Sequence, residues 1–256
     1  MLKNRMKEKI SLGQALAGVV IAEASVATVE LLALCGFDFV FIDCEHGPMT
    51  VESVSNMVMA AERRGIEALV RTPVNTEETI LRYMDTGADG IIIPGMDSLE
   101  AAEAAVKAVK YKPAGNRGLA GVRAADYGLS GPLGEYVQEA NRETMVFGVV
   151  ESMAGVENID AILTAEGLDG VLMGTNDLAN SIGLTGQTGH PDVLKAVDRI
   201  VAAGLAAGKA VGGVVRAGET PQQYIDKGCK IVLTASQALL AGAAKAFLNK
   251  IENRAV

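Results

Sequence analysis

The chain has 256 residues, 49% of them hydrophobic and 4% aromatic, with a net charge of -8. This length suits one full core, because α/β barrels of about 250 residues commonly form a single domain. The acidic balance excludes the basic surface that nucleic-acid binding requires, so we expect no nucleic-acid partner.

The N-terminal residues 1–9 are basic but lead into a polar stretch instead of a long apolar run. This pattern is neither that of a signal peptide nor that of a transmembrane helix, so we expect a cytoplasmic protein with no membrane partner. The three cysteines, Cys35, Cys44 and Cys229, are odd in number and form no CxxC pair. We expect reduced core thiols, and neither a disulfide framework nor a zinc site.

Short apolar runs alternate with helical patterns along the chain. The expected strands are residues 17–22, 37–43, 67–72, 90–94, 146–150, 169–174, 210–215 and 230–235. The expected helices are residues 26–34, 51–64, 76–86, 99–111, 156–167, 190–208, 221–227 and 237–250. Eight buried strands, each followed by a helix, predict one (β/α)8 barrel over residues 1–256. The main irregularity is the long connection 112–144, of the kind that serves a site or an interface.

Polar residues follow the expected strands, at the end of a barrel where catalytic groups lie. They are Asp43, Glu45 and His46 after the second strand, Arg71 after the third, Glu151 after the fifth, Gly174 and Asp177 after the sixth and Arg216 after the seventh. No lysine is among them, since Lys110 is expected in a helix and Lys209 before the seventh strand. A Schiff-base aldolase would need such a lysine, so carbonyl chemistry here requires a metal.

Glu151 and Asp177 are expected at the ends of neighbouring strands, about 4.8 Å apart. Two carboxylates without cysteine offer hard oxygen ligands, which favour Mg or Mn, with Co also open, over a closed zinc site. They leave coordination positions for a 2-oxo acid, whose carbonyl the metal would polarise. Backbone N–H groups after Gly174 are candidates for binding the substrate carboxylate. Arg71 is the candidate for the enolate oxygen and His46 for the base.

Taken singly, each residue also has a structural interpretation. Glu151 would then be a solvated rim residue, Asp177 a helix N-cap, and Arg71 part of a scaffold ion pair. His46 would be an ordinary loop residue. Glu45 is interpreted as structural or peripheral, because its side chain should point away from its neighbour's. The joint occurrence of polar groups at five strand ends favours a site.

These residues carry a resemblance to the HpcH/HpaI aldolase family. The matching segments are 36–47, 71–73, 110–118, 150–152, 166–178 and 190–193, in order along a match that covers residues 12–248. The resemblance implies a barrel of the phosphoenolpyruvate/pyruvate type and a class II aldolase. Such an enzyme cleaves a 4-hydroxy-2-oxo acid into pyruvate, or a related 2-oxo acid, and an aldehyde. The resemblance also implies a divalent metal and a homohexamer, a trimer of dimers with C-terminal helices, about residues 237–250, exchanged between subunits.

By position, the resemblance implies that Glu151 and Asp177 hold the metal, that His46 is the base and that Arg71 stabilises the transition state. The residues implied to meet the substrate carboxylate are Gly174, Thr175 and Asn176.

Two aspartates are candidate partners of the histidine. Asp85 matches one that the family uses to raise the basicity of this histidine. Because Asp85 is expected late in a helix, near the bottom of its own barrel, it should reach His46 only across a subunit interface. Asp43 is the nearer partner within the chain, and both assignments stay open.

The sequence departs from the family at Val149, where members carry Gln, and at Val20, where a Trp is common. Neither position holds the metal or the base, so the departures bear on the aldehyde partner. Two alternatives remain. One is a citrate-lyase-like enzyme acting on acyl-CoA esters, which the pI of 4.9 disfavours. The other is a non-catalytic barrel that binds 2-oxo acids.

Overall fold

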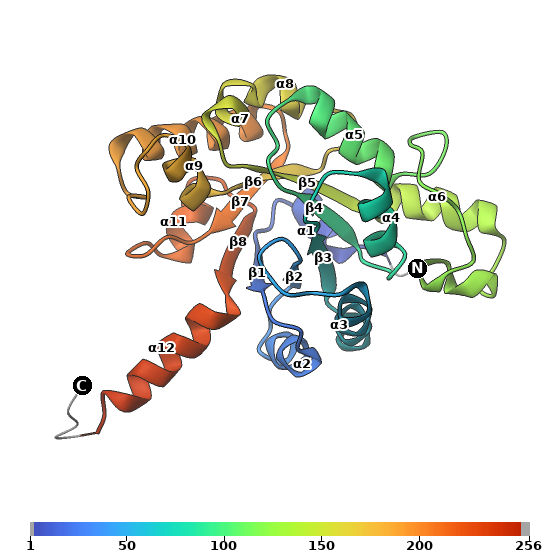
Figure 1. Cartoon of the computed structure of the whole chain (residues 1–256), viewed down its shortest axis with the longest axis horizontal. Helices are drawn as coiled ribbons and strands as arrows, with labels where there is room; N and C mark the ends of the chain where they lie inside the picture. The colour runs from blue at the N-terminus through green and yellow to red at the C-terminus, as the bar shows by residue number, and fades with distance from the viewer. Residues whose placement is uncertain (1–2, 252–256) are drawn as a thin grey trace.

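Eight parallel strands close into a barrel in which each strand pairs with the next and β8 pairs with β1 (Figure 1). The computed structural model describes residues 3–251. The strands are β1 (Leu16–Ile21), β2 (Phe39–Asp43), β3 (Glu67–Arg71), β4 (Gly90–Ile93), β5 (Met145–Val150), β6 (Gly170–Met173), β7 (Ala210–Val214) and β8 (Ile231–Ala235). Every expected strand is present with small shifts at its ends, so the predicted (β/α)8 barrel is confirmed.

Helices connect the strands and cover the outside of the barrel (Figure 1). They are α1 (Arg5–Ser11), α2 (Val26–Leu34), α3 (Val51–Arg64), α4 (Glu77–Met84), α5 (Leu99–Val109), α6 (Leu133–Glu143), α7 (Met153–Glu157), α8 (Ile159–Leu163), α9 (Thr175–Ser181), α10 (Pro191–Ala206), α11 (Pro221–Asp226) and α12 (Ser236–Leu248), with a 3-10 segment η1 (Arg123–Gly128). The single helix expected over 156–167 is wrong. It is two short helices, because the chain leaves helical geometry at Asn158, whose side chain donates to the Asp97 carbonyl at 2.8 Å.

Side-chain caps determine where many of the helices begin. The capping residues, each accepting a backbone N–H three residues further along, are Ser25, Thr50, Thr76, Ser98, Ser152 and Thr220. A cap of this kind contributes about 1 kcal/mol. Because these helices follow the strands after short loops, the caps also fix the lengths of the loops that carry polar residues at the top of the barrel.

The core has two layers. One lies between the strands and the outer helices, and the other fills the lumen of the barrel with side chains such as Phe39 and Phe147. Met6 belongs to the lumen cluster, so α1, which the sequence did not predict, closes the bottom of the barrel. Gly18 has to be glycine here, because a Cβ at this position would lie 2.3 Å from the Phe39 ring.

A repeated clamp fastens the bottom of the barrel. An aspartate stands directly before β2, β4 and β6 and accepts a backbone N–H from the preceding strand. The pairs are Asp38 with Ala17 at 2.7 Å, Asp89 with Ala68 at 2.8 Å and Asp169 with Val146 at 2.8 Å. A glycine with positive φ stands two residues before each aspartate, at positions 36, 87 and 167. The fourth equivalent position is Lys230, whose Nζ donates to the Gly13 carbonyl at 2.5 Å.

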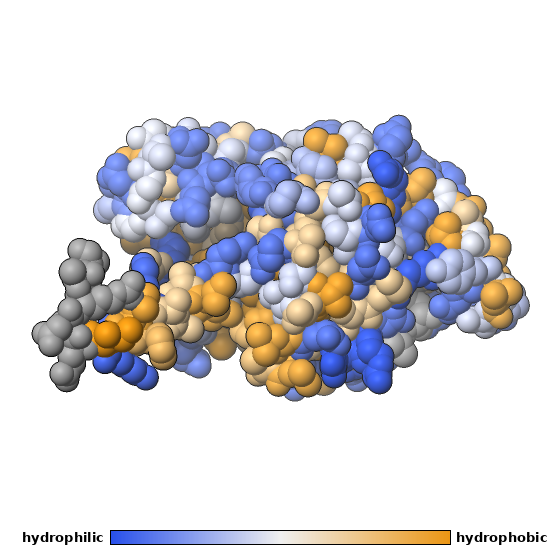
Figure 2. Space-filling model, turned by 60° about the horizontal axis from the view of Figure 1, so that its bottom comes forward, coloured by the Kyte–Doolittle hydropathy of each residue, from blue (hydrophilic) through white to orange (hydrophobic). Residues whose placement is uncertain are grey.

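The C-terminal helix α12 extends away from the barrel (Figure 1), and Ser236 is its one buried residue. Large apolar side chains are exposed along it, including Leu240 at 74% and Phe247 at 67%. Figure 2 shows hydrophobic (orange) surface along the projecting arm that α12 forms. The helix expected over about residues 237–250 is therefore present, and it leaves an apolar surface uncovered by the rest of the chain.

Within residues 3–251, no helix combines the length and apolar character needed to cross a membrane. Cys44 and Cys229 are buried free thiols, as expected. The expectation is wrong for Cys35, which is exposed because it forms the C-terminal end of α2, where the chain turns at Gly36.

Candidate active site

A cavity of about 430 Å³ opens at the C-terminal ends of the strands. The predicted residues that line it are His46, Arg71, Glu151, Gly174, Thr175, Asn176 and Asp177. Its floor is apolar and consists of side chains such as Val20, Phe41, Val149, Leu172 and Leu233. The two family departures, Val20 and Val149, thus lie in the same cavity as the predicted site.

Arg71 ends β3 and is held by Asp43, its register partner at the end of β2. The guanidinium donates from Nε to Asp43 Oδ1 at 3.0 Å and from Nη2 to Oδ2 at 2.7 Å. It also lies over the Phe41 ring, 5.4 Å from the centroid. This bidentate pair fixes the guanidinium plane. Burial acts to raise the pKa of the Asp43 carboxyl, but Arg71 and nearby backbone N–H groups outweigh it and hold that pKa below its usual value.

Asp43 also contacts the backbone of His46, and not its imidazole. Its Oδ1 accepts the backbone N–H of Glu45 at 3.1 Å and that of His46 at 3.2 Å. The carboxylate that lies near the imidazole belongs to Glu45, whose Oε2 is 3.8 Å from His46 Nε2. The same oxygen is 2.9 Å from Arg71 Nη1. The Glu45 side chain therefore lies beside those of His46 and Arg71, contrary to the expectation that it points away from its neighbour's.

Glu151 follows β5 and accepts the backbone N–H of Gly95 at 2.6 Å. Burial raises the pKa of its carboxyl above the ordinary value, and the negative charges of Glu45 and Asp177 raise it further. Gly174 leaves room for this side chain, because a Cβ at that position would lie 2.8 Å from Glu151 Oε2. Glu151 and Asp177 thus form a pair of neighbouring carboxylates at the ends of β5 and β6.

The helix α9 begins at Thr175, directly after Gly174, and carries the remaining predicted residues in its first turn. Thr175 is buried, whereas Asn176 and Asp177 are exposed towards the cavity. The short strand β6 and the immediate start of the helix therefore place three predicted residues together at the cavity wall.

Asp85 lies elsewhere, outside the lining of this cavity. It ends α4 and pairs with Arg117 through Nη2 and Oδ1 at 2.9 Å. Arg117 is 1% exposed and lies 4.7 Å from the Tyr111 ring centroid. Within the described chain, the structure therefore groups Asp85 with the 112–144 connection and separates it from the cavity that contains His46.

The two lysines considered for a Schiff base are engaged at other places. Lys110 Nζ donates to the carbonyls of Asn141 and Thr144 at 2.8 and 2.6 Å, before the start of β5. Lys209 Nζ donates to the Leu168 carbonyl at 2.6 Å. Burial lowers the pKa of Lys110 to about 8. Neither lines the cavity at the strand ends, in agreement with a site that lacks a lysine nucleophile.

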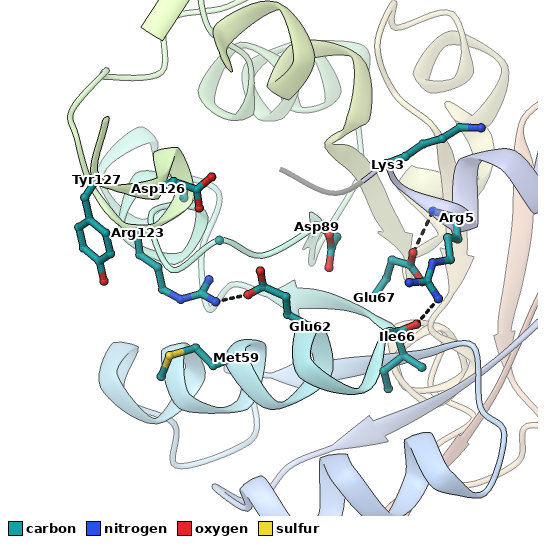
Figure 3. A pocket seen from close by; sticks show the side chains of 13 residues that line it. Lys3, Arg5, Met59, Glu62, Ile66, Glu67, Asp89, Arg123, Asp126 and Tyr127 are labelled. Atoms are coloured by element: carbon teal, nitrogen blue, oxygen red, sulfur yellow. Dashed lines mark hydrogen bonds and ion pairs between the residues drawn. The ribbon is translucent and has the colours of Figure 1, made fainter. Parts of the chain in front are cut away.

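A second cavity, of about 300 Å³, lies at the opposite end of the barrel (Figure 3). Its lining includes Arg5, Glu62, Glu67, Asp89 and Arg123. The dashed lines in Figure 3 mark three contacts. The Arg5 backbone N–H donates to Glu67, the Arg5 guanidinium donates to the Gly65 carbonyl, and Arg123 pairs with Glu62. Burial raises the pKa of Asp89 to about 7, and the charges of Glu67 and Glu62 add to the effect. These charged groups bind one another or the backbone, so their role is to stabilise the fold at the bottom of the barrel.

The donor set at the top cavity fits a hard divalent cation. Glu151 and Asp177 supply carboxylate oxygens, and the crowding of negative charge around Glu151 is what a cation would relieve. Over residues 3–251, no group of three or more His, Cys, Asp or Glu side chains converges as a metal site. A metal held here would therefore have two protein ligands and open positions for a small molecule.

Three contributors to the site escaped the sequence reasoning. Glu45 was judged by strand alternation, although it lies in a bend after β2 has ended. The sequence alone carries no signal that the Phe41 ring lies under the Arg71 guanidinium. The Gly95 N–H was not identified as a donor, although the Pro-Gly pair after β4 indicated a turn there, and Gly95 indeed has a φ of +58°.

Comparison with known proteins agrees with this geometry. The profile of the HpcH/HpaI aldolase/citrate lyase family matches residues 17–242. A 5-keto-4-deoxy-D-glucarate aldolase of Salmonella paratyphi C is 32% identical over 248 residues, which are 97% of this chain and 95% of the relative. Both matches extend over the strands that carry the cavity.

Two solved structures show the same likeness. An HpcH/HpaI aldolase from Desulfitobacterium hafniense has a TM-score of 0.91 at 29% identity, covering 99% of this chain and 98% of its own. The citrate synthase SbnG has a TM-score of 0.86 at 29% identity, covering 95% of each chain. The resemblance inferred from the motifs and the predicted aldolase class are confirmed. The chain therefore belongs to the HpcH/HpaI aldolase/citrate lyase family.

Proposed function

We propose that the protein is a divalent-metal-dependent aldolase that reversibly cleaves a 4-hydroxy-2-oxo acid into pyruvate, or a related 2-oxo acid, and an aldehyde. The observation that carries this proposal is that Glu151, Asp177, Arg71 and His46 border one cavity, whose described lining contains no lysine. A binding protein would have no need for a base and a fixed guanidinium beside a carboxylate pair.

Glu151 and Asp177 would hold the cation, for which Mg, Mn and Co are the candidates. When bound, the cation supplies Lewis-acid polarisation of the 2-oxo group. A cation held by these two carboxylates would bring the carboxylate and keto oxygens of the substrate near Gly174, Thr175 and Asn176. There, backbone N–H groups orient the acid end.

Arg71 and His46 divide the remaining chemistry. The Arg71 guanidinium, 12% exposed and fixed by Asp43, stabilises the negative charge that develops on the enolate oxygen as the C3–C4 bond breaks. His46 is 63% exposed at the rim and removes the proton from the 4-hydroxyl. In the synthetic direction it returns that proton to the alkoxide. The apolar floor excludes water from the enolate, which strengthens these charge interactions.

The substrate that we propose to test first is a sugar-derived 2-oxo acid, because a curated relative is named 5-keto-4-deoxy-D-glucarate aldolase. Likeness to a citrate synthase supports testing the carbon–carbon bond-forming direction as well. We place this chemistry in the cytoplasm, where free cysteines such as Cys44 and Cys229 stay reduced.

We also propose a homohexamer, a trimer of dimers in which α12 is exchanged between subunits. The exposed Leu240 and Phe247 on the projecting α12 support this assembly, since a neighbouring subunit would bury them (Figure 2). In such an assembly Asp85 would reach the His46 imidazole of a neighbouring subunit. Light scattering of the full chain and of Leu240→Asp tests the assembly, because the charged variant should form smaller species.

Exchange of the pyruvate methyl protons in D2O, followed by NMR, tests the enolising half-reaction without a known aldehyde. We expect exchange after metal-stripped protein receives Mg, Mn or Co, no exchange without metal, and none with His46→Ala. Glu157→Gln, an exposed position on α7, serves as the control and should exchange like the wild type. A folded protein that exchanges nothing with any of the three metals would contradict the proposal and leave a 2-oxo-acid-binding barrel.

A further inference from the structure

The floor of the top cavity consists of apolar side chains from five strands. Two register pairs form most of it, Val20 with Phe41 on β1 and β2, and Val149 with Leu172 on β5 and β6. Leu233 of β8 completes it. Except for the half-buried Val20, these side chains are at most 4% exposed and belong to the apolar cluster in the lumen. None of the five offers a hydrogen-bond donor or acceptor to a bound molecule.

The polar side chains of the cavity stand on segments at or after the strand ends. They belong to Arg71 at the end of β3, Glu151 after β5, His46 in the loop after β2, and Thr175, Asn176 and Asp177 in the first turn of α9. His46 is 63% exposed and marks the rim. The cavity is therefore divided into a polar wall, which begins at the strand ends, and an apolar floor within the barrel.

Val149 brings the floor up to the residues that we assign to the acid end of the substrate. A Cβ at Gly174 would lie 2.8 Å from Glu151 Oε2 and 3.0 Å from Val149 Cγ1. Gly174 thus packs against the carboxylate and the floor at once. A 2-oxo acid bound beside Gly174 would therefore border the Val149 side chain.

In the proposed reaction, the wall meets the polar ends of the substrate. The carboxylate lies at the backbone N–H groups after Gly174, the keto oxygen faces Arg71, and the 4-hydroxyl faces His46 at the rim. The C3 atom lies between these ends, and the lining left for a further group on C3 is the floor. This placement of the substrate rests on the proposed function, whereas the apolar character of the floor does not.

We propose that the floor selects the 2-oxo acid by the group on its C3, accepting hydrogen or an alkyl group and disfavouring a hydroxyl. A hydroxyl on the floor would lose its hydrogen bonds to water and gain none in return. A methyl group of similar size has no such bonds to lose and buries apolar surface. The substrate class is thus that of 2-oxo acids with an unsubstituted or alkyl-substituted C3, and hydroxyl groups further along the substrate lie towards the rim.

The acids 2-oxobutanoate and 3-hydroxypyruvate test the floor, because they carry a methyl group and a hydroxyl group at the same C3 position. Calorimetric titration of Mn-loaded protein gives the dissociation constant of each acid without any need for turnover. We expect 2-oxobutanoate to bind about 10- to 100-fold more tightly, which is the discrimination that an apolar pocket achieves between a methyl and a hydroxyl group. Inhibition of pyruvate proton exchange should rank the two acids in the same order.

Threonine variants of the floor show whether it causes the preference. Val149→Thr replaces one methyl group by a hydroxyl that can donate and accept, so the preference should fall to about threefold or less. Val20→Thr is the second probe, because this half-buried position accepts a hydroxyl with little risk to folding, and it should also reduce the preference. Val74→Thr is the matched control. Val74 is 48% exposed and lies outside the cavity lining, so this variant should keep the wild-type ratio.

Equal affinity for the two acids would overturn the inference, and so would tighter binding of 3-hydroxypyruvate or no binding of either acid. A preference that persists unchanged in both Val149→Thr and Val20→Thr would also overturn it. A protein that prefers 2-oxobutanoate but exchanges no pyruvate protons would keep the selectivity of the floor and refute the proposed function. Conversely, pyruvate exchange by a protein that binds both acids equally would leave the proposed function standing and refute this inference alone.

Discussion

The two ends of the barrel hold similar carboxylates with opposite uses. At the bottom, Asp38 and Asp169 accept backbone N–H groups of neighbouring strands. At the top, Glu151 and Asp177 face a cavity, and their mutual repulsion adds to the raised pKa of Glu151. All parallel strands begin at the bottom of the barrel and end at the top. At the bottom, the first backbone N–H groups of a strand have no carbonyl partner on the neighbouring strand. An acid before a strand thus finds a backbone donor and stabilises the fold, whereas Glu151 and Asp177 line a cavity, even though Glu151 also accepts the Gly95 N–H.

Removing a top carboxylate should produce the largest effect on activity. Glu151→Gln should lower metal-dependent proton exchange by about 10²-fold or more, since the amide is a weaker ligand for a hard cation. Thermal stability should hold or rise, because burial disfavours the charged form of Glu151. Exchange kinetics and a melting curve test both statements. Wild-type turnover by this variant would remove Glu151 from the metal site.

A substitution at the end of the neighbouring strand β6 can displace the Glu151 carboxylate and so test its role in metal binding. Gly174→Ala would place a Cβ 2.6 Å from the Glu151 Cβ and 2.8 Å from its Oε2. We expect the displaced carboxylate to weaken metal binding by about 10- to 100-fold, which is typical when a ligand is disoriented. Calorimetric titration with Mn checks this, and Gly134→Ala, which meets no atom within 4 Å, is the control. Equal affinity for both variants would contradict the prediction.

Removing a bottom carboxylate should affect stability and spare turnover. Asp38→Ala leaves the Ala17 N–H and the Lys9 ammonium without their partner, at a cost of about 0.5–1.5 kcal/mol in the free energy of unfolding, because water can reach both groups. Urea denaturation measures the loss, with exchange kinetics alongside. If Asp38→Ala lowered kcat without lowering stability, the bottom carboxylates would not differ in role from those at the top.

The smallest effect concerns Asp89, the bottom aspartate whose pKa burial raises to about 7 from the ordinary 3.8. The folded state binds this proton more tightly, so stability is highest below pH 3.8 and falls as the pH rises towards 7. Asn can still accept the Ala68 N–H but cannot ionise. Asp89→Asn should therefore melt like the wild type near pH 4 and about 2–5 °C higher at pH 8. Asp226→Asn, at an exposed position of α11, should show no such trend.

The sequence was sufficient for the strands because short Val- and Ile-rich runs bounded by glycine or charged residues mark buried parallel strands, and the fold keeps them. It was also sufficient to bring Glu151 and Asp177 together, since that needs only the strand order. It did not predict α1, whose single lumen residue, Met6, is recognisable only once the barrel is closed. Periodicity likewise cannot detect a break such as that at Asn158, which a tertiary hydrogen bond stabilises.

The arrangement around His46 was out of reach for a different reason. Asp43 and Glu45 lie within three residues of the histidine, so sequence separation cannot rank them as its partners. In the structure Asp43 forms a bidentate pair with Arg71, and this pair depends on the register of β2 against β3. Side-chain alternation failed for Glu45 because the strand ends at Asp43.

The clamp position at the bottom of the barrel recurs before every second strand, which divides the barrel into four units of two strands each. Glycine, one residue and then aspartate recur before β2, β4 and β6, so the structural unit is a strand, a helix, a second strand and a second helix. The fourth copy has Lys230 in place of the aspartate, and its ammonium binds the segment before β1. Three joints are thus closed by the same acid, and the seam where the ring is completed is closed by a base.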